Sequence, residues 1–222
     1  MEDRIIKLIG KDNLAKIKKS KILLIGIGGV GSCVFELLVR SNFLNITIID
    51  KDNIELSNLN RQIISTSKNI GNAKVKESTK RALLINPEIK INSIKAFLTE
   101  EDITLDFINK YDYIIDACDT VEVKKALLLT TSKHNKHLIS CMGTANRLNP
   151  QNLEIIKLKD TKNDPLAKVL RRLCRDSKKA MNSLVVCSNE LPKKQKDLGT
   201  MMMVPMASAT LIVSKVVKDI IQ

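Results

Sequence analysis

The stretch Lys21-Ile-Leu-Leu-Ile-Gly-Ile-Gly-Gly-Val-Gly-Ser32 decides how this chain folds. Its first half is a short, largely apolar run of branched residues, which is typical of a buried parallel strand, and glycines follow at once. Helical apolar spacing continues over residues 32–39, and residues 46–50 predict a second strand that ends in the carboxylate of Asp50. The pattern indicates a strand–helix–strand unit with a glycine-rich turn after its first strand.

The same alternation of strands and helices continues along the chain. We expect further strands at 89–94, 113–116, 137–141 and 152–158, helices at 73–85, 121–132, 165–175 and 205–221, and polar loops at 177–182 and 192–197. This order predicts a Rossmann-like, doubly wound α/β fold with a mainly parallel sheet and a ligand site at the carboxyl ends of its strands. We expect residues 1–222 to form one domain, with a basic helical segment at 1–20 and a basic, partly mobile segment at 157–197.

Composition excludes several classes of protein. Apolar residues make up 44% of the 222 residues and charged residues 27%, which argues against collagen-like, low-complexity and disordered chains. The longest weakly charged stretch, residues 198–213, is short for a membrane span and contains Pro205. The N-terminal residues have no apolar core of signal-peptide length, so we expect a cytosolic protein that does not enter a membrane.

Positive charge is concentrated in two places. The 37 basic and 24 acidic residues give a net charge of +13. Residues 1–21 carry seven basic and three acidic residues, and residues 157–197 carry twelve and five, so these two segments hold eleven of the thirteen charges. This distribution favours a polyanionic partner, while lysines that only solvate a surface remain the alternative.

The cysteine pattern argues against a zinc ribbon or a disulfide scaffold. Five cysteines are an odd number, and none are spaced as Cys-x-x-Cys. Neither His134 nor His137 has a carboxylate three or four residues away, so a His-x-x-His metal site is disfavoured. Cys187 lies close to the basic loops and is the best candidate for a reactive thiol, against the simpler interpretation of an inert, partly buried cysteine.

A nucleotide site is indicated where the first strand meets its helix. The glycines of the turn allow the backbone to approach phosphates at a helix N-terminus; they are Gly26, Gly28, Gly29 and Gly31. Asp50 follows Gly31 by nineteen residues, a distance at which a carboxylate can bind ribose hydroxyls. These features alone allow either a dinucleotide or ATP.

The residues after Asp50 favour a triphosphate. Within 25 residues of Asp50 the chain places Asp52, Asn58, Arg61 and Lys74, and arginine and lysine can neutralise phosphates during substitution. Further on, Asp119 follows a predicted buried strand, where a carboxylate can hold Mg²⁺ against phosphate oxygens. Asp119 could equally cap a helix that begins at Thr120.

Taken in order, these residues resemble the ubiquitin-activating-enzyme-like superfamily of ATP-dependent carboxylate adenylating enzymes. The resemblance implies that Asp50 holds the ribose, that Asn58, Arg61 and Lys74 bind the phosphates, and that Asp119 binds magnesium. Arg4 resembles the arginine that family members insert into the neighbouring subunit's active site, which implies a homodimer.

The second half resembles one branch of that superfamily, the tRNA threonylcarbamoyladenosine dehydratases. The resemblance rests on the motifs at 143–150, 163–172 and 185–190, with mild departures at Asn149-Pro150 and Ser188-Asn189-Glu190. It implies an enzyme that adenylates the threonine carboxylate of the modified adenosine beside the tRNA anticodon and closes a ring with loss of water, releasing AMP and pyrophosphate. No protein nucleophile is required, because proximity supplies the second step.

A basic run in the second half is expected to contact tRNA phosphates, with affinity that falls as salt rises. Its members are Arg171, Arg172, Arg175, Lys178 and Lys179. Three other functions stay open: activation of a ubiquitin-like sulfur carrier's C-terminal carboxylate, a non-catalytic nucleotide-sensing or RNA-binding module, and a nicotinamide dehydrogenase. The sequence also leaves open whether a sulfur-transfer protein assists.

Overall fold

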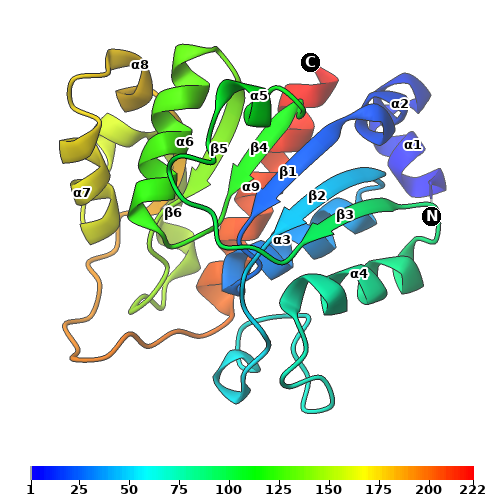
Figure 1. The fold of residues 1–222 in the computed structure, drawn as a ribbon, viewed down its shortest axis with the longest axis horizontal. Helices are drawn as coiled ribbons and strands as arrows, with labels where there is room; N and C mark the ends of the chain where they lie inside the picture. The colour runs from blue at the N-terminus through cyan, green and yellow to red at the C-terminus, as the bar shows by residue number, and fades with distance from the viewer. Residues whose placement is uncertain (1) are drawn as a thin grey trace.

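The computed structural model describes residues 2–222 and forms a seven-stranded sheet (Figure 1). The strand order is β3-β2-β1-β4-β5-β7-β6, and every pairing is parallel except that of β6 with β7. The strands are β1 (Lys21–Ile25), β2 (Asn45–Ile49), β3 (Lys90–Ile94), β4 (Tyr113–Asp116), β5 (His137–Cys141), β6 (Leu153–Lys157) and β7 (Leu184–Ser188). The predicted doubly wound, mainly parallel α/β sheet is confirmed.

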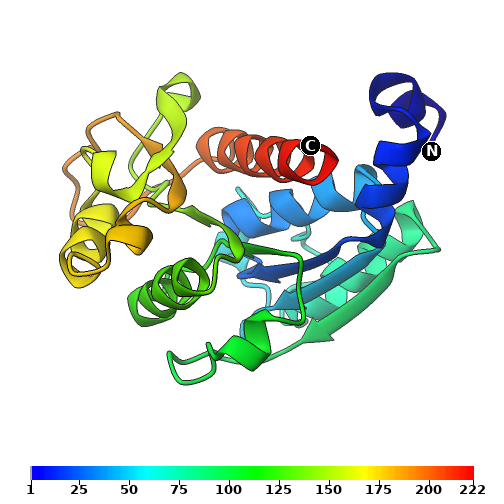
Figure 2. The same cartoon turned by 90° about the horizontal axis from the view of Figure 1, so that it is seen from above.

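Helices cover both faces of the sheet (Figure 2). Side chains alternate along β1, so Ile22 and Leu24 pack in a cluster with α3 (Gly29–Arg40), α4 (Lys74–Ile85) and α9 (Met203–Ile221). The intervening Leu23 and Ile25 pack in a second cluster with α5 (Leu105–Ile108) and α6 (Val121–Lys133). Burial on both faces explains why β1 is apolar almost throughout.

The order of the strands places the site. Strand β1 lies between β2 and β4, and Ile25 pairs with Ile49 on one side and with Asp116 on the other. The loops after these three strands therefore leave the sheet at the same edge, at the point where the strand order reverses. This is the position at which ligands bind in open α/β sheets.

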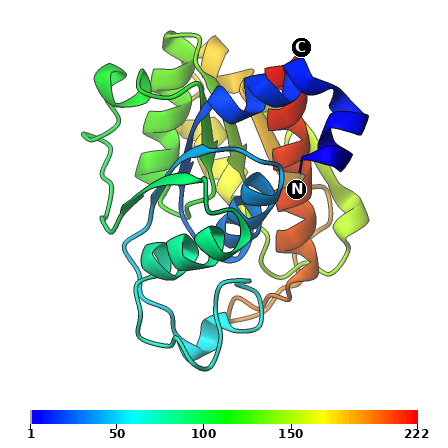
Figure 3. The ribbon, with the colours of Figure 1, turned by 90° about the vertical axis from the view of Figure 1, so that its right-hand side faces the viewer.

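The second half of the chain differs most from the sequence-based expectation. Strand β7 was not predicted, and residues 178–181 form a short helix, α8 (Lys178–Met181), where a loop was expected. Helix α7 (Pro165–Leu173) ends two residues before the predicted end. A third apolar cluster, with Leu170 and Ala180 completely buried, holds α7 and α8 against α6 and β7. Helix α9 packs along α3 (Figure 3). Single 3₁₀ turns occur at Leu56–Asn58, Pro150–Asn152 and Leu158–Asp160.

The basic N-terminal segment is helical, as predicted, although Met1 lies outside the described residues. Helices α1 (Asp3–Ile9) and α2 (Lys11–Lys19) meet at Gly10, whose φ of 81° allows the turn between them. Leu14 and Ile17 are buried, so α2 is fixed to the domain by its apolar side. Within residues 2–222, no helix combines the length and the apolar character needed to cross a membrane.

Candidate functional site

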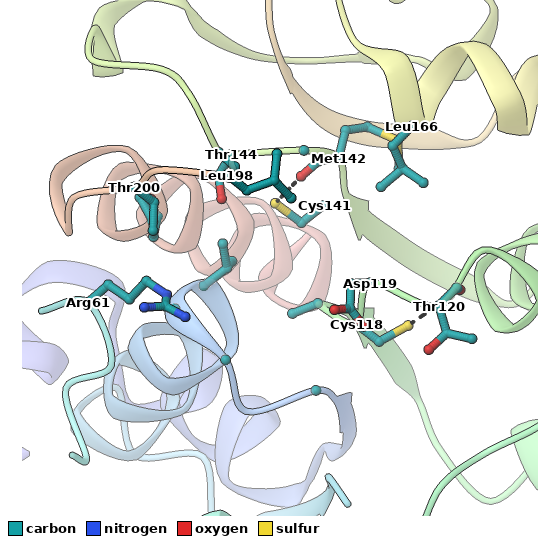
Figure 4. A pocket seen from close by; sticks show the side chains of 18 of the residues that line it. Arg61, Cys118, Asp119, Thr120, Cys141, Met142, Thr144, Leu166, Leu198 and Thr200 are labelled. Atoms are coloured by element: carbon teal, nitrogen blue, oxygen red, sulfur yellow. Dashed lines mark hydrogen bonds between the residues drawn. The ribbon is translucent and has the colours of Figure 1, made fainter. Parts of the chain in front are cut away.

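A cavity of about 1180 Å³ opens at the carboxyl edge of the sheet. It lies among the loops that follow β1, β2, β4 and β5, and it is bounded by the segments 57–62 and 192–200. Figure 4 shows Arg61 on one side of the cavity and Asp119 on the other. Mixed polar and apolar walls around a space of this size suit a nucleotide together with a second substrate.

The glycine turn is shaped so that backbone amides face this cavity. A Cβ atom at Gly31 would lie 1.8 Å from the carbonyl oxygen of Gly26, and one at Gly26, where φ is 89°, would lie 2.7 Å from the carbonyl oxygen of Ala117. Gly28 precedes the first turn of α3, and no side chain caps the amides there. The free N–H groups of this helix N-terminus are available to an anion such as a phosphate.

Asp50 is held against the glycine turn. Its carboxylate accepts hydrogen bonds from the backbone N–H of Ile27 at 2.6 Å and of Asp52 at 2.8 Å. Each oxygen uses one acceptor site in this way and keeps another for a ligand. Asp50 also lines the cavity, so the structure places it where a ribose hydroxyl could donate to it.

The polar residues predicted after Asp50 gather at the same end of the cavity. Lys74, at the start of α4, is buried, and its Nζ lies 2.9 Å from a carboxylate oxygen of Asp52. Arg61 donates to the backbone carbonyl of Ser57 and, at 3.0 Å, to the side chain of Asn60. Together with the buried Asn58, these groups form a cationic and amide-rich wall beside the glycine turn.

Asp119 is an exposed carboxylate at the rim of the cavity rather than a helix cap. The N-cap of α6 is Thr120, and no side chain bonds there to the first turn of the helix. The alternative role as an N-cap, which the sequence left open, is therefore wrong. Among residues 2–222, no group of three His, Cys, Asp or Glu side chains gathers as a metal site. A single carboxylate fits Mg²⁺ that is held mainly by nucleotide phosphates and water.

Sequence reasoning missed a fully buried network beneath Asp119. The Nζ of Lys124 lies 2.9 Å from an oxygen of Asp116 and 2.7 Å from the carbonyl oxygen of Cys141. Ser140 donates to the same Asp116 oxygen. Burial opposes the charge on Lys124, but the attraction of Asp116 outweighs it and raises the pKa of Lys124. The network ties β4, β5 and α6 together under the loop that carries Asp119.

Arg147 forms a second buried network on the far side of the cavity. Its guanidinium lies 2.9 Å from the carboxylate of Asp164 and donates to the backbone carbonyls of Asn163, Ser188 and Glu190. Arg147 and Asp164 both line the cavity, and the Nε of Arg147 has no hydrogen-bond partner within residues 2–222. This arginine fastens three loops around the end of the cavity away from the glycine turn.

The cysteines do not supply a reactive thiol. Cys187 is buried and does not line the cavity, and burial raises its pKa to about 12. Cys118 does line it, but burial, followed by the charge of Asp116, raises its pKa strongly. Both groups are thiols at neutral pH, which favours the inert interpretation of Cys187.

The remaining predicted site residues lie outside the cavity. Arg4 is an exposed residue of α1. The predicted tRNA contacts are on α7, on α8 and between them, and Arg171 is half-buried because its guanidinium bonds to Thr161. The other four are exposed: Arg172, Arg175, Lys178 and Lys179.

The chain is similar to known adenylating enzymes over almost all of its length. The ThiF family model matches residues 2–220. The tRNA threonylcarbamoyladenosine dehydratase of Bacillus subtilis is 38% identical over 83% of this chain and 72% of its own length. The dehydratase of Escherichia coli is 34% identical, and the aligned part spans 74% of this chain and 62% of that enzyme.

Solved structures agree with the sequence comparison. The Escherichia coli tRNA N6-threonylcarbamoyladenosine dehydratase in complex with AMP matches with a TM-score of 0.91 at 31% identity, over 97% of this chain and 91% of that chain. The same enzyme was also solved with ATP. A molybdopterin-synthase adenylyltransferase of Haemophilus influenzae is 36% identical over 66% of this chain and 59% of its own length.

Proposed function

This chain belongs to the ThiF family, and from that membership we propose that it is an ATP-dependent enzyme that dehydrates N6-threonylcarbamoyladenosine in tRNA. One observation carries the proposal. Arg61 and Lys74 line the same cavity as the N-terminus of α3, and that cavity continues to the Arg147 network. The space suits ATP and a second, carboxylate-bearing substrate side by side.

The first step transfers AMP to the threonine carboxylate. A carboxylate oxygen attacks the α-phosphorus of ATP, the bond to the bridging oxygen breaks, and pyrophosphate leaves. The backbone amides at Gly28 and Gly29 bind phosphate oxygens, and Arg61 and Lys74 neutralise the charge that builds up on the α-phosphate. Asp50 orients the nucleotide through its ribose.

A magnesium ion fits the carboxylate of Asp119, which lies across the cavity from Arg61. Asp119 would hold the ion together with phosphate oxygens, and the ion would supply further neutralisation of phosphate charge. Asp52 forms an ion pair with Lys74, which fixes that ammonium beside the phosphates.

Ring closure follows without a protein nucleophile. The carbamoyl group of the same nucleoside attacks the activated carbonyl carbon, AMP leaves, and one proton is lost, so the net change in the nucleoside is the loss of one water. The reacting groups are already in one molecule, and holding them in place accounts for the rate of this step. The raised pKa of Cys187 and its burial agree with a route that bypasses a thioester.

The partners follow from the same proposal. The exposed cations of α7 and α8 would contact phosphates of the tRNA body. As the resemblance to the family implies, a second copy of the chain would supply Arg4 to the cavity; that side chain is exposed and lies outside the cavity of its own subunit. Free cysteines suit a reducing compartment, so we place the enzyme in the cytosol.

A second candidate function is activation of the C-terminal carboxylate of a ubiquitin-like sulfur carrier. The similarity to the molybdopterin-synthase adenylyltransferase favours it, because the ATP-site residues would be shared. The absence of Cys-x-x-Cys pairs in the sequence and the net charge of +13 favour an RNA substrate instead. A sulfur-transfer protein that assists this enzyme stays a prediction.

One experiment separates the two functions. The purified protein is incubated with ATP, magnesium and tRNA bearing threonylcarbamoyladenosine. The tRNA is then digested to nucleosides, whose masses are measured by mass spectrometry. We expect an ATP-dependent nucleoside lighter by one water. Failure to form it, together with ATP–pyrophosphate exchange on a carrier-protein carboxylate, would assign the chain to the second function.

A further inference from the structure

The segment of residues 192–199, here called the strap, lies in the connection between β7 and α9 (Figure 1) and borders the opening of the cavity. It has no regular secondary structure, as was expected for residues 192–197. Most of its residues line the cavity, among them Lys193, Lys194 and Leu198. Figure 4 shows Leu198 beside Thr144, and both Leu198 and Asp119 line the cavity, so the strap borders the same space as the nucleotide site.

Both ends of the strap are tied to one residue. The backbone N–H of Lys193 donates to the carbonyl of Asn146 at 2.8 Å. At the other end, Gly199 accepts from the N–H of Asn146 and donates to its side-chain oxygen, each at 2.7 Å. Asn146 has a φ of 60°, a conformation that asparagine tolerates better than most residues. These hydrogen bonds hold the two ends of the strap together beside the cavity.

The strap carries three lysines and one acidic residue, Asp197, so its net charge is +2. Lys193, Lys194 and Lys196 are exposed, and within residues 2–222 none of them lies within 4.0 Å of a carboxylate oxygen. By contrast, two cations inside the cavity wall have a carboxylate partner, since Lys74 pairs with Asp52 and Arg147 with Asp164. Lys193 and Lys194 are adjacent like charges in a segment whose net charge is positive, so a bound polyanion would relieve their repulsion.

We infer that Lys193 and Lys194 of the strap bind the RNA phosphates that flank the reacting nucleoside. This inference rests on the proposed function. A nucleoside that enters the cavity carries a phosphate on each side of its ribose, and those phosphates stay at the mouth, where the strap lies. Leu198, which is 84% exposed, offers an apolar surface for a neighbouring base. The cations of α7 and α8 do not line the cavity, so they would contact phosphates farther from the reacting nucleoside.

The test measures tRNA affinity and its dependence on salt in the full-length protein. The double variant Lys193→Ala, Lys194→Ala should bind tRNA bearing threonylcarbamoyladenosine about tenfold more weakly, with an unchanged affinity for ATP. In a plot of log affinity against log salt concentration, the steepness of the slope should fall by roughly 0.7 for each phosphate contact that the variant loses. The charge-preserving double variant to arginine should keep the slope of the wild type.

A matched control removes the same charge from the opposite edge of the sheet. Lys90 begins β3 and Lys110 precedes β4, so both lie at the amino ends of the strands. Lys90→Ala, Lys110→Ala should reduce affinity by much less than the strap variant. Equal effects of the two double variants, or a loss of ATP affinity in the strap variant, would overturn the inference.

The design separates this inference from the proposed function. If the wild type binds and dehydrates the tRNA and the strap variant does so equally well, only the assignment of the strap fails. If the wild type forms no dehydrated nucleoside and tRNA binding is not affected by salt in any variant, the proposed function fails with it.

Discussion

The ammonium of Lys124 lies 2.9 Å from the carboxylate of Asp116 at a position where neither side chain is exposed to solvent. Burying two charges costs several kcal/mol. Here Lys124 also donates a hydrogen bond to the Cys141 carbonyl, and Asp116 accepts one from Ser140, and both bonds offset part of that cost. The pair joins the end of β4 to the first turns of α6, and Asp119 sits on the loop between them. We therefore regard Lys124 as a positioning residue for Asp119.

Removing one partner of this pair should destabilise the fold. Lys124→Met leaves a buried carboxylate without its counter-ion, and we expect a loss of about 3–5 kcal/mol in the free energy of unfolding, measured with urea. The double variant Lys124→Met, Asp116→Asn removes both charges and should recover part of that loss. The pKa of Lys124 is raised above the ordinary lysine value of 10.5. The stability that its charge contributes is therefore fully present at pH values below 10.5 and is lost as the pH rises through the raised pKa. The single variant Asp116→Asn completes the cycle, and a loss in the double variant equal to the sum of the two single losses would show that the charges are not coupled.

Asp119 should matter for turnover and not for folding. Its side chain is exposed and caps no helix, so Asp119→Ala should change the free energy of unfolding by less than about 0.5 kcal/mol. If it holds magnesium at the phosphates, kcat for dehydration should fall by roughly 100-fold to 1000-fold. Glu122→Ala, which removes another negative charge at the start of α6, serves as the control. Turnover that survives Asp119→Ala would remove this residue from the mechanism.

The first half of the fold could be predicted because its signals are local. The run before Gly26 is apolar enough to be buried on both faces, and Asp50 follows at a spacing that a strand–helix–strand unit requires. Strand β7 was missed because five residues with a short apolar run do not distinguish a strand from a helix. Helix α8 has only four residues and depends on the Ser177 cap and on packing around Ala180, which are tertiary effects.

The site was predictable in its residue types but not in its pairings. Asp50, Arg61 and Lys74 line the cavity as the spacing indicated. The ion pair of Lys124 with Asp116 connects a strand to a helix, and a lysine on an amphipathic helix ordinarily signals solvent. Arg147 lies within the motif at 143–150, but no role was predicted for it, and only the packing of three loops shows that its guanidinium is buried.

Two glycines of the turn should respond differently to the same substitution. A Cβ atom at Gly31 would overlap the Gly26 carbonyl, so Gly31→Ala should lower the free energy of unfolding by more than about 4 kcal/mol or prevent folding. At Gly28, no atom lies within 4 Å of a Cβ position and φ is −86°, so Gly28→Ala should fold normally. Its methyl group would still intrude where phosphates approach, and ATP affinity should fall about tenfold, or 1.4 kcal/mol. Calorimetry would measure both quantities, and normal unfolding of Gly31→Ala would contradict the geometry of the turn.

Acid should weaken the contact between α3 and α4. Burial opposes the charge of Glu36, but hydrogen bonds from Arg81 and Arg40 outweigh it and lower the pKa of Glu36. The stability from this group is therefore present above its ordinary pKa of 4.5 and is lost as pH falls through the lowered value. At pH 7, Glu36→Gln should reduce the free energy of unfolding by about 1–3 kcal/mol, and the difference from the wild type should shrink in acid. Thermal unfolding between pH 3 and pH 7 tests this, with the exposed Glu88→Gln as control; a difference that stays constant with pH would contradict it.

Cys187 should be dispensable for the reaction. Burial raises the pKa of Cys187 to about 12, which disfavours the reactive thiolate, and the sulfur does not line the cavity. Cys187→Ala should therefore cost about 1–2 kcal/mol of stability, through the lost buried volume, and leave kcat within about twofold of the wild type. Mass spectrometry of the intact protein during turnover should find no covalent adduct, because the acyl-adenylate is consumed by the nucleoside's own carbamoyl group. A folded variant with kcat reduced 100-fold or more, or an adduct on Cys187 in the wild type, would instead require a thioester route, and burial would then have to be relieved during the catalytic cycle.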